Sequence, residues 1–465
     1  MKSWKTIVLC LILIFFFGGC SEPPEPLEEP EPLPPNILII LADDAGYADF
    51  GFQGETDLST PNIDRLASRG VVFSDAHVTA TVCSPSRAGL LTGRYQQRFG
   101  YESNSPPASM GLDAAERTLA ALLKEQGYRT GAFGKWHLGL QDEHHPNYRG
   151  FDEFYGFLGG SRSYFPSPLQ DRPGSPRAIM HNREYVSFEG YLTDVLAERA
   201  ASFIAESKNR PFFAYLSFNA VHTPMEADRA DMNRFAGHQR QILAAMTWAM
   251  DRAVGRVIDT LDELGIRDNT LVFFLSDNGG AAFNNSRNLP LKGWKGNKFE
   301  GGHRVPFLAS WPGRIEEGAT FTGLTSSLDI VPTALALALP EGSDIPAGLD
   351  GVDLLPFLLD DRQENPHELL FWRKEDASAV RMGEWKLIRL DDYDSVLYNL
   401  EDDLGETSDL SSANPDKLSE MISLLESWEE ELEEPRWHEG EGWVRVTRNI
   451  HQALMDNKEP GRIAP

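Results

Sequence analysis

The sequence is poor in cysteine. Its 465 residues include only three, Cys10, Cys20 and Cys83. The first two belong to the apolar N-terminal segment or follow it directly, so the body of the mature chain keeps Cys83 alone. A disulfide within that body is therefore excluded. Because a single cysteine is more often buried filler than a nucleophile, the neighbours of Cys83 must decide its role.

The N-terminus lacks an apolar run long enough to span a membrane. Residues 7–17 form an apolar stretch of eleven residues, preceded by two lysines and followed by Gly-Gly-Cys20, and eleven residues are too few for a spanning helix. A basic start, a short apolar core and small residues are typical of an export signal, which we predict over residues 1–19. The small residues before Cys20 resemble the lipobox at which bacterial lipoproteins are cut and acylated, although Phe17 stands where leucine is commoner. We expect export to the periplasm or cell envelope with a lipid anchor at Cys20; plain signal cleavage is the alternative.

Basic residues are scarce as well. The chain has 43 Lys and Arg against 70 Asp and Glu, a formal net charge of −27 that becomes −29 once the two lysines of residues 1–19 are removed. Such a charge argues against nucleic acid as a partner. An anionic substrate would need a local cluster of positive charge, including a bound metal.

Residues 20–35 predict a tether rather than a folded element. Residues 21–35 include seven prolines and five glutamates, a composition that favours extended polyproline geometry and has nothing to bury. The folded body is therefore expected to begin near residue 36.

From residue 36 short apolar runs alternate with amphipathic stretches, which predicts an α/β fold. The apolar, β-rich runs cover residues 36–41, 129–133, 211–218 and 270–275. The helical patterns cover residues 61–68, 116–126, 191–206 and 241–264. This order indicates a catalytic domain over residues 36–365, built on a large, mostly parallel sheet with helices on both faces.

Residues 366–465 predict a small C-terminal α+β subdomain. Shorter apolar runs at 369–372, 385–390 and 396–400 indicate an antiparallel sheet, and a helix is expected over 415–433. Residues 436–465 allow no assignment.

Polar residues gather where the predicted strands of the large sheet end. They are Asp43, Asp44, Lys135, His137, His222, Asp277 and Asn278. In open α/β sheets ligands bind beyond the carboxyl ends of the strands. Three carboxylates and an amide oxygen are hard ligands suited to Ca²⁺ or Mg²⁺, and they disfavour zinc. Acidic pairs alone often cap helices or form turns, but here both pairs follow buried strands.

The segment Cys83-Ser84-Pro85-Ser86-Arg87, followed by Leu91-Thr92-Gly93-Arg94, resembles the type I sulfatase signature C-x-P-S-R-x-x-x-L-T-G. In that family a maturation enzyme reads the Cys, Pro and Arg and converts the cysteine to formylglycine. The resemblance extends over nearly all of the chain after residue 35. It includes residues 134–139, 222–224, 276–279, Lys295 and 385–387. It implies an alkaline-phosphatase-like fold.

The resemblance also implies a mechanism. A hydrated formylglycine offers two hydroxyls: one attacks sulfur and expels the alcohol, and the other then loses its proton so that sulfate is eliminated. The metal, expected to be Ca²⁺ with Mg²⁺ as the alternative, would be held by Asp43, Asp44, Cys83, Asp277 and Asn278. The remaining roles would fall to Arg87 at the hydrate, to Lys135 and His137 at formylglycine and sulfate, and to His222 and Lys295 at the ester oxygen, with His222 as general acid.

A sulfated oligo- or polysaccharide is the expected substrate, because an exported enzyme meets external polysaccharides. A phosphonate or phosphodiester hydrolase on the same scaffold and a silent carbohydrate-binding homologue remain the alternatives. Polar loop residues, among them Arg162, Asn284 and Arg287, are candidates for lining sugar subsites. His77 is expected to support the formylglycine loop, and His303 is a further candidate for touching substrate.

Overall fold

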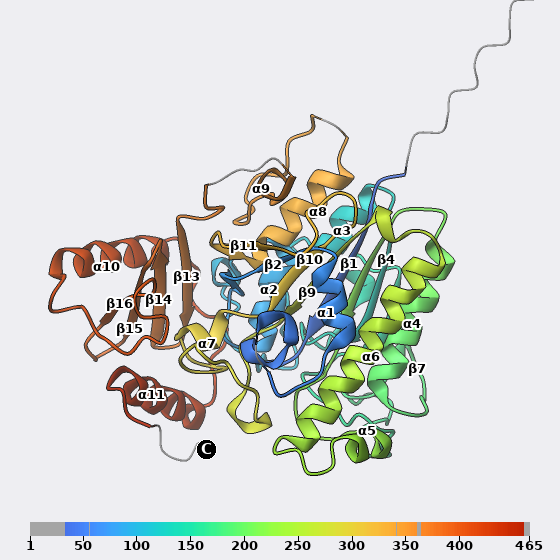
Figure 1. Cartoon of the computed structure of the whole chain (residues 1–465), viewed down its shortest axis with the longest axis horizontal. Coiled ribbons are helices and arrows are strands. Elements are labelled where there is room, and N and C mark those ends of the chain that lie inside the picture. Colours follow the sequence, from blue (N-terminus) through green and yellow to red (C-terminus); the bar gives the residue numbers. More distant parts are fainter. Residues whose placement is uncertain (1–32, 55, 341, 360–363, 460–465) are drawn as a thin grey trace, which may run out of the picture. The chain divides into compact units, whose positions relative to one another are not determined.

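The computed structural model of the protein describes residues 33–54, 56–340, 342–359 and 364–459 (Figure 1). Internal contacts divide the chain into two units, Met1–Leu33 and Pro34–Pro465, and the description below concerns the second. The predicted signal peptide, the lipid anchor and the tether up to residue 32 lie outside the described residues. Within the described ranges, no helix combines the length and apolar character needed to cross a membrane.

The described residues form a ten-stranded sheet whose centre is parallel. The strand order is β11-β2-β10-β9-β1-β8-β4-β5-β6-β7. The bounds are β1 Asn36–Ala42, β2 Val71–Phe73, β4 Arg129–Lys135, β5 Glu153–Phe157, β6 Met180–His181, β7 Glu184–Tyr185, β8 Phe212–Ser217, β9 Thr270–Ser276, β10 Phe307–Ser310 and β11 Ala319–Phe321. Neighbours from β9 to β5 run parallel, whereas β10, β6 and β7 pair antiparallel. The predicted mostly parallel sheet is confirmed.

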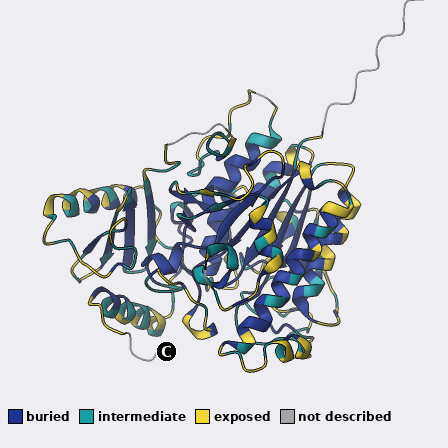
Figure 2. Ribbon diagram, viewed as in Figure 1, coloured by how far each residue is buried: buried dark blue, intermediate teal, exposed yellow. Residues whose placement is uncertain are grey.

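Helices cover both faces of this sheet (Figures 1 and 2). Leu38 and Ile40 of β1 pack with α1 (Pro61–Ser68), α4 (Leu192–Ser207) and α6 (Gln241–Glu263). Ile37 and Ile39 point to the other face, toward α2 (Cys83–Thr92), α3 (Leu119–Glu125) and α8 (Ile330–Ala338). Successive side chains of a strand alternate between faces, so a strand covered on both sides must be apolar throughout. Shorter helices are α5 (Arg229–Arg234), α7 (Glu300–His303) and α9 (Leu355–Leu359).

One predicted helix of this domain differs at its start, and helices α2, α5, α7, α8 and α9 were not predicted. The helix predicted over 116–126 begins only at Leu119, because Thr118 caps it: the Thr118 hydroxyl accepts a hydrogen bond from the Ala121 amide at 3.2 Å. Helix α2 was not predicted. All ten of its residues are buried, so it shows none of the polar-to-apolar alternation by which a surface helix is recognised.

The C-terminal part forms an antiparallel sheet between two helices. Strands β13 (Leu369–Lys374), β14 (Ala377–Met382), β15 (Trp385–Leu390) and β16 (Val396–Asn399) pair in sequence order. One face packs on α10 (Pro415–Glu429) and the other on α11 (Glu441–Met455) and on Phe299 and Leu324 of the preceding chain. A two-stranded sheet of β3 (Ala76–His77) and β12 (Thr325–Ser326) completes the topology. Neither β14 nor α11 was predicted.

Six ionisable residues, mostly buried, join the two sheets. This junction cluster consists of Asp75, Glu300, Arg304, Arg381, Lys386 and Glu406. The Lys386 ammonium lies 2.9 Å from Glu300 and 2.8 Å from Glu406. Its third neighbour is His303 Nε2, at 3.1 Å. Three polar groups therefore surround this lysine, two of them carboxylates.

Candidate active site

The active-site side chains come from the carboxyl ends of four neighbouring strands. In the sheet order β9-β1-β8-β4, Ala42 of β1 pairs with Ser276 of β9, so the acidic pairs that follow these strands leave the sheet side by side. The Asp44 amide donates to Asp277 Oδ1 at 3.2 Å. The Asp43 carbonyl accepts the Val221 amide at 2.7 Å, which holds the loop after β8 beside β1. The sheet topology alone thus brings together residues more than 200 positions apart.

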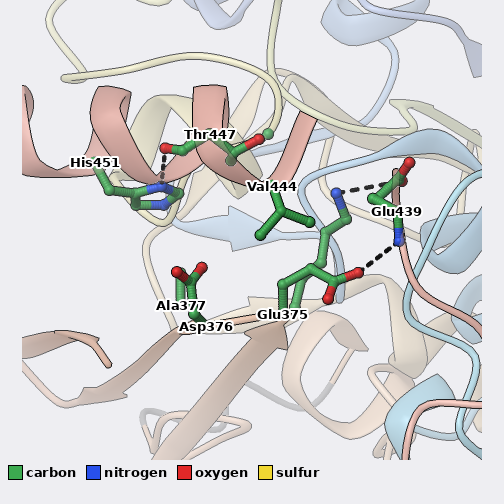
Figure 3. A pocket seen from close by; sticks show the side chains of 9 residues that line it. Glu375, Asp376, Ala377, Glu439, Val444, Thr447 and His451 are labelled. Carbon is green, nitrogen blue, oxygen red and sulfur yellow. Dashed lines mark hydrogen bonds and ion pairs between the residues drawn. The ribbon is translucent and has the colours of Figure 1, made fainter. Parts of the chain in front are cut away.

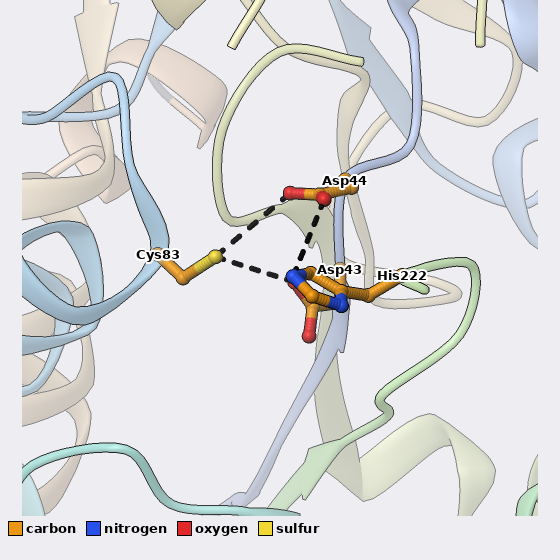
Figure 4. Close-up of side chains that lie close together, drawn as sticks. All are labelled: Asp43, Asp44, Cys83 and His222. Atoms are coloured by element: carbon orange, nitrogen blue, oxygen red, sulfur yellow. Dashed lines mark hydrogen bonds and ion pairs between the residues drawn. The ribbon is translucent and has the colours of Figure 1, made fainter. Parts of the chain in front are cut away.

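Helix α2 delivers Cys83 to this edge of the sheet (Figure 4). Cys83 is its first residue, and its Sγ lies 3.5 Å from Asp43 Oδ1 and 3.8 Å from Asp44 Oδ1. Burial and the nearby Asp277 carboxylate raise the pKa of the thiol above its ordinary value. The unmodified side chain is therefore a protonated thiol and not a thiolate nucleophile.

Arg87 lies one turn after Cys83 and ties the helix to two strand ends. Its guanidinium donates twice to Asp277 Oδ2, at 2.7 and 3.0 Å, and also bonds to the Lys135 carbonyl and the Ser217 hydroxyl. Burial works against its charge, but Asp277 and the other nearby anions raise its pKa. Arg87 is a permanent cation held in one orientation.

Two lysines neutralise the acidic pair after β1. Lys135 Nζ lies 2.6 Å from Asp43 Oδ2, and Lys295 Nζ lies 2.6 Å from Asp44 Oδ1 and 3.1 Å from Cys83 Sγ. Burial alone would lower the pKa of Lys295, yet Asp44 and the other anions raise it overall. We name Asp43, Asp44, Arg87, Lys135, Asp277 and Lys295 the catalytic cluster.

Two histidines border the cluster. His222 Nδ1 donates to the Thr223 carbonyl at 2.7 Å, which leaves Nε2 directed at Asp44 Oδ2, 3.6 Å away. Burial lowers its pKa, although Asp44 favours the charged form. His137 follows β4 with a left-handed backbone, φ 60°. Glycine at 160 makes room for its ring, since a Cβ there would lie 2.5 Å from His137 Nε2.

The oxygen ligands of this site fit a hard divalent cation. Asp43, Asp44, Cys83 and His222 each offer a ligand atom, and these atoms lie within 4.8 Å of one another. Asp44 Oδ2 and Asn278 Oδ1 are buried acceptors without a hydrogen-bond donor in the described part of the chain. Burial and the nearby Asp43 carboxylate raise the pKa of Asp277 to about 6, the effect expected where carboxylates crowd together. A bound cation would give the unpaired acceptors a partner and would favour the charged form of Asp277.

All ten residues proposed from the sequence lie at this one edge of the sheet, and some neighbours were missed. Ser217 Oγ donates to the Lys135 carbonyl at 2.8 Å. Asn104 Oδ1 accepts the Ser84 amide at 2.9 Å and so holds the first turn of α2. The polar end of β8 could have pointed to Ser217; no feature of its own stretch pointed to Asn104.

Three other sequence predictions are wrong. Arg162 and Asn284 are 1% and 0% exposed and bond to backbone carbonyls, so they do not line a sugar subsite. His303 is also fully buried, stacked on Trp372 with ring centroids 3.9 Å apart. Its Nδ1 lies 3.0 Å from that of His77, and both rings belong to the contact between the two sheets.

Comparison with known proteins agrees with this arrangement. The family model described as Sulfatase matches residues 35–339, and the one described as N-sulphoglucosamine sulphohydrolase, C-terminal, matches residues 293–435. N-acetylgalactosamine-6-sulfatase of Homo sapiens is 35% identical over 76% of this chain and 71% of its own length. Arylsulfatase A of Bos taurus is 38% identical over 76% of this chain and 74% of its own.

A solved structure extends the likeness to nearly the whole chain. Ps i-CgsB, crystallised in complex with k-i-k-neocarrahexaose, superposes with a TM-score of 0.83 at 38% identity, over 91% of this chain and 99% of that one. The chain therefore belongs to the sulfatase family and is a sulfuric ester hydrolase.

Proposed function

We propose that the protein hydrolyses sulfate esters of a sulfated galactan or glycosaminoglycan, with Cys83 matured to formylglycine and with Ca²⁺ as the metal. The observation that carries this proposal is the position of Cys83 Sγ, 3.1 Å from Lys295 Nζ and 3.5 Å from Asp43 Oδ1. A nucleophile formed at that atom would stand between cations able to hold sulfate and oxygens able to hold a metal. The relatives named for sulfated sugars support the substrate class.

Asp43, Asp44, Asp277 and Asn278, with the matured side chain of residue 83, would hold the metal. A divalent cation bound there would polarise the sulfate oxygens and favour ionisation of a nearby hydroxyl. Ca²⁺ is favoured over zinc because the protein donors are oxygens. Mg²⁺ shares that preference and is the alternative.

The remaining residues have separable tasks. Arg87, fixed by Asp277, would orient the hydrated aldehyde of residue 83, and Lys135 and His137 would contact the sulfate. Lys295 uses two of its N–H bonds on Asp44 and Cys83; the third has no acceptor in the described part of the chain and can reach the ester oxygen.

The proton for the departing alcohol would come from His222. Its Nδ1–H is committed to the Thr223 carbonyl, so only Nε2 can serve the substrate. Delivery of a proton from Nε2 requires the imidazolium. Burial lowers the pKa of His222, and the Asp44 carboxylate at 3.6 Å counteracts this effect.

Export and anchoring complete the proposal. An external polysaccharide is reached by a protein that leaves the cytosol, as the predicted signal over residues 1–19 and the lipid anchor at Cys20 would arrange. Residues 20–35 would serve as the tether, 36–365 as the catalytic domain and 366–465 as the C-terminal subdomain. A formylglycine-generating enzyme would be the partner that matures Cys83.

The test is sulfate release from a panel of sulfated oligosaccharides, beside a phosphate diester. We expect release from at least one sugar ester, and a peptide containing residue 83 about 18 Da lighter than the thiol form. A much higher rate on the diester would favour the phosphodiester hydrolase. Full activity with an intact Cys83 thiol would refute the proposed nucleophile.

A further inference from the structure

A groove with a volume of about 310 Å³ begins at the active site and runs along helix α11. Val82 and Lys295 line its inner end. Val82 directly precedes Cys83, and Lys295 Nζ contacts the Cys83 sulfur at 3.1 Å. The outer end is lined by Trp443 and Val446 of α11, in the segment for which the sequence allowed no assignment. The groove is thus continuous with the catalytic cluster.

The groove has exposed aromatic walls. Phe283 is 57% exposed and Trp443 is 48% exposed, and Trp294 also lines the groove. The Phe283 ring centre lies 5.9 Å from Lys295 Nζ, so the aromatic surface starts directly beside the catalytic ammonium. Large apolar side chains left facing solvent around one groove are typical of a ligand-binding surface.

Polar groups lie among these aromatics. Asn104, Lys374, Glu439 and Thr447 line the groove. Lys374 Nζ lies 3.3 Å from Glu439 Oε1. Glu375 accepts the Glu439 amide at 2.8 Å, and Figure 3 shows these two glutamates in a second pocket that shares Lys374, Glu439 and Thr447 with the groove. A lining of aromatic faces with a few fixed polar groups matches a pyranose ring, which has apolar C–H faces and a rim of hydroxyls.

The outer wall is fixed relative to the nucleophile. Glu439 Oε1 accepts the Asn104 amide at 3.0 Å, and Asn104 Oδ1 accepts the Ser84 amide at 2.9 Å. Two hydrogen bonds therefore connect the start of α11 to the first turn of α2. A ligand in the groove would be positioned by the same backbone that positions residue 83.

We propose that this groove is a sugar subsite that binds the unit next to the sulfated one, on the side of the departing alcohol. The proposal rests on the proposed function, because the catalytic cations must hold the sulfate for the alcohol to extend past Lys295. The alcohol of a polysaccharide ester continues into further sugar units, and the groove opens where those units emerge. Phe283 and Trp443 would stack on them and select oligosaccharides over small esters.

The test compares substrates of different length in Trp443→Ala and Phe283→Ala. The probes are nitrophenyl sulfate and the sulfated hexasaccharide that the panel above identifies as the best substrate. Because removing an aromatic face weakens the binding of the sugar that stacks on it, each variant should raise KM for the hexasaccharide about twofold to tenfold. For Trp443→Ala, the variant farther from Lys295 along the groove, kcat/KM for nitrophenyl sulfate should change less than about twofold. Trp443→Phe should restore most of the loss.

The matched control is Tyr185→Ala, which removes an aromatic side chain of 43% exposure from β7, outside the groove. It should change KM for neither substrate. An unchanged KM for the hexasaccharide in both groove variants would overturn the subsite while leaving the proposed function intact. An equal loss of kcat/KM on both probes in Trp443→Ala would also overturn the subsite, since it would indicate damage to the catalytic cluster. If the unaltered enzyme released sulfate from no ester, the proposed function would fail, and the subsite with it.

Discussion

The catalytic cluster and the junction cluster have the same charge composition and different pairing. Each combines three carboxylates with three basic side chains. In the junction, Glu300 alone lies within 3.5 Å of all three cations, and Lys386 lies within 3 Å of two carboxylates. In the catalytic cluster Lys295 keeps one N–H free among the described contacts, and Asp44 Oδ2 lacks a donor there. The junction cluster also has two atoms without a hydrogen bond in the described part of the chain, Arg381 Nη1 and Glu406 Oε1.

The difference shows what separates a structural ion cluster from a functional one. Burying charge is costly unless its groups are paired, and what sets the catalytic cluster apart is that its open groups surround one reactive side chain, Cys83. The junction holds two sheets together. Under the proposed function the open groups of the catalytic cluster would bind a metal and a substrate, so changes in the two clusters should affect different measurements.

Cys83→Ala should produce the largest effect, confined to activity. Removing the nucleophile should lower kcat about 10⁴-fold or more, while a small change in side-chain volume should alter the free energy of unfolding by less than about 1.5 kcal/mol. Sulfate release and thermal denaturation measure the two quantities. Residual activity above one per cent would mean that the catalytic cluster works without residue 83.

Lys386→Met should lower stability and leave activity almost unchanged. It leaves Glu300 and Glu406 buried without their lysine, and loss of one partner of a buried ion pair costs about 3–5 kcal/mol. Denaturant unfolding should show this loss, while kcat of the folded protein at low temperature changes less than about twofold. The double variant Lys386→Met, Glu406→Leu should recover part of the stability. A large fall in kcat would show that the clusters are coupled.

Metal removal should affect both sulfate release and the free energy of unfolding. A chelator should abolish sulfate release, and at a metal concentration 100 times the Kd the lost binding lowers the free energy of unfolding by about 2.7 kcal/mol. Adding Ca²⁺ back should restore both. Asp44→Asn, which weakens the ligand set, should make the unfolding midpoint insensitive to the chelator. An unchanged wild-type midpoint after chelation would contradict the metal site.

The smallest effect is expected for an exposed ion pair outside both clusters. Arg65 and Asp259 lie 2.6 Å apart with side chains 43% and 49% exposed. Solvent screening limits such pairs to less than about 1 kcal/mol, so Arg65→Ala should shift the unfolding midpoint slightly and leave kcat unchanged. A loss as large as that of Lys386→Met would show that burial does not distinguish the junction cluster.

Strand ends and one short signature were enough to predict which ten residues meet at this edge of the sheet. Asp43 and Asp277 follow apolar runs that could only be buried strands, and parallel strands end at a common edge. What the sequence could not predict depends on contacts between distant segments. In the sequence, Lys386 is one polar residue within a predicted β-strand. Only the packing of the two sheets against each other gives it Glu300 and Glu406 as partners.

The same limit applies to the wall of the groove. Helix α11 begins after Gly440 with a second glycine at 442, and a glutamate-rich stretch precedes it, so its start carries little helical signal. The helix forms because its apolar residues pack on the C-terminal sheet. Trp443 then faces a groove whose other wall is more than 140 residues earlier, at residues 282–297, a proximity that no local pattern encodes.

Asp44 and His137 have left-handed backbones, φ 61° and 60°. An L-residue in that region costs roughly 1–2 kcal/mol relative to the right-handed form, a cost that glycine avoids. At His137 selection for heat resistance alone would therefore favour glycine, and the gain in melting temperature would remove the proposed sulfate contact. At Asp44 glycine would also leave Lys295 without its buried carboxylate, which opposes such a gain. A search for stabilised variants of this protein therefore has to measure turnover together with melting temperature.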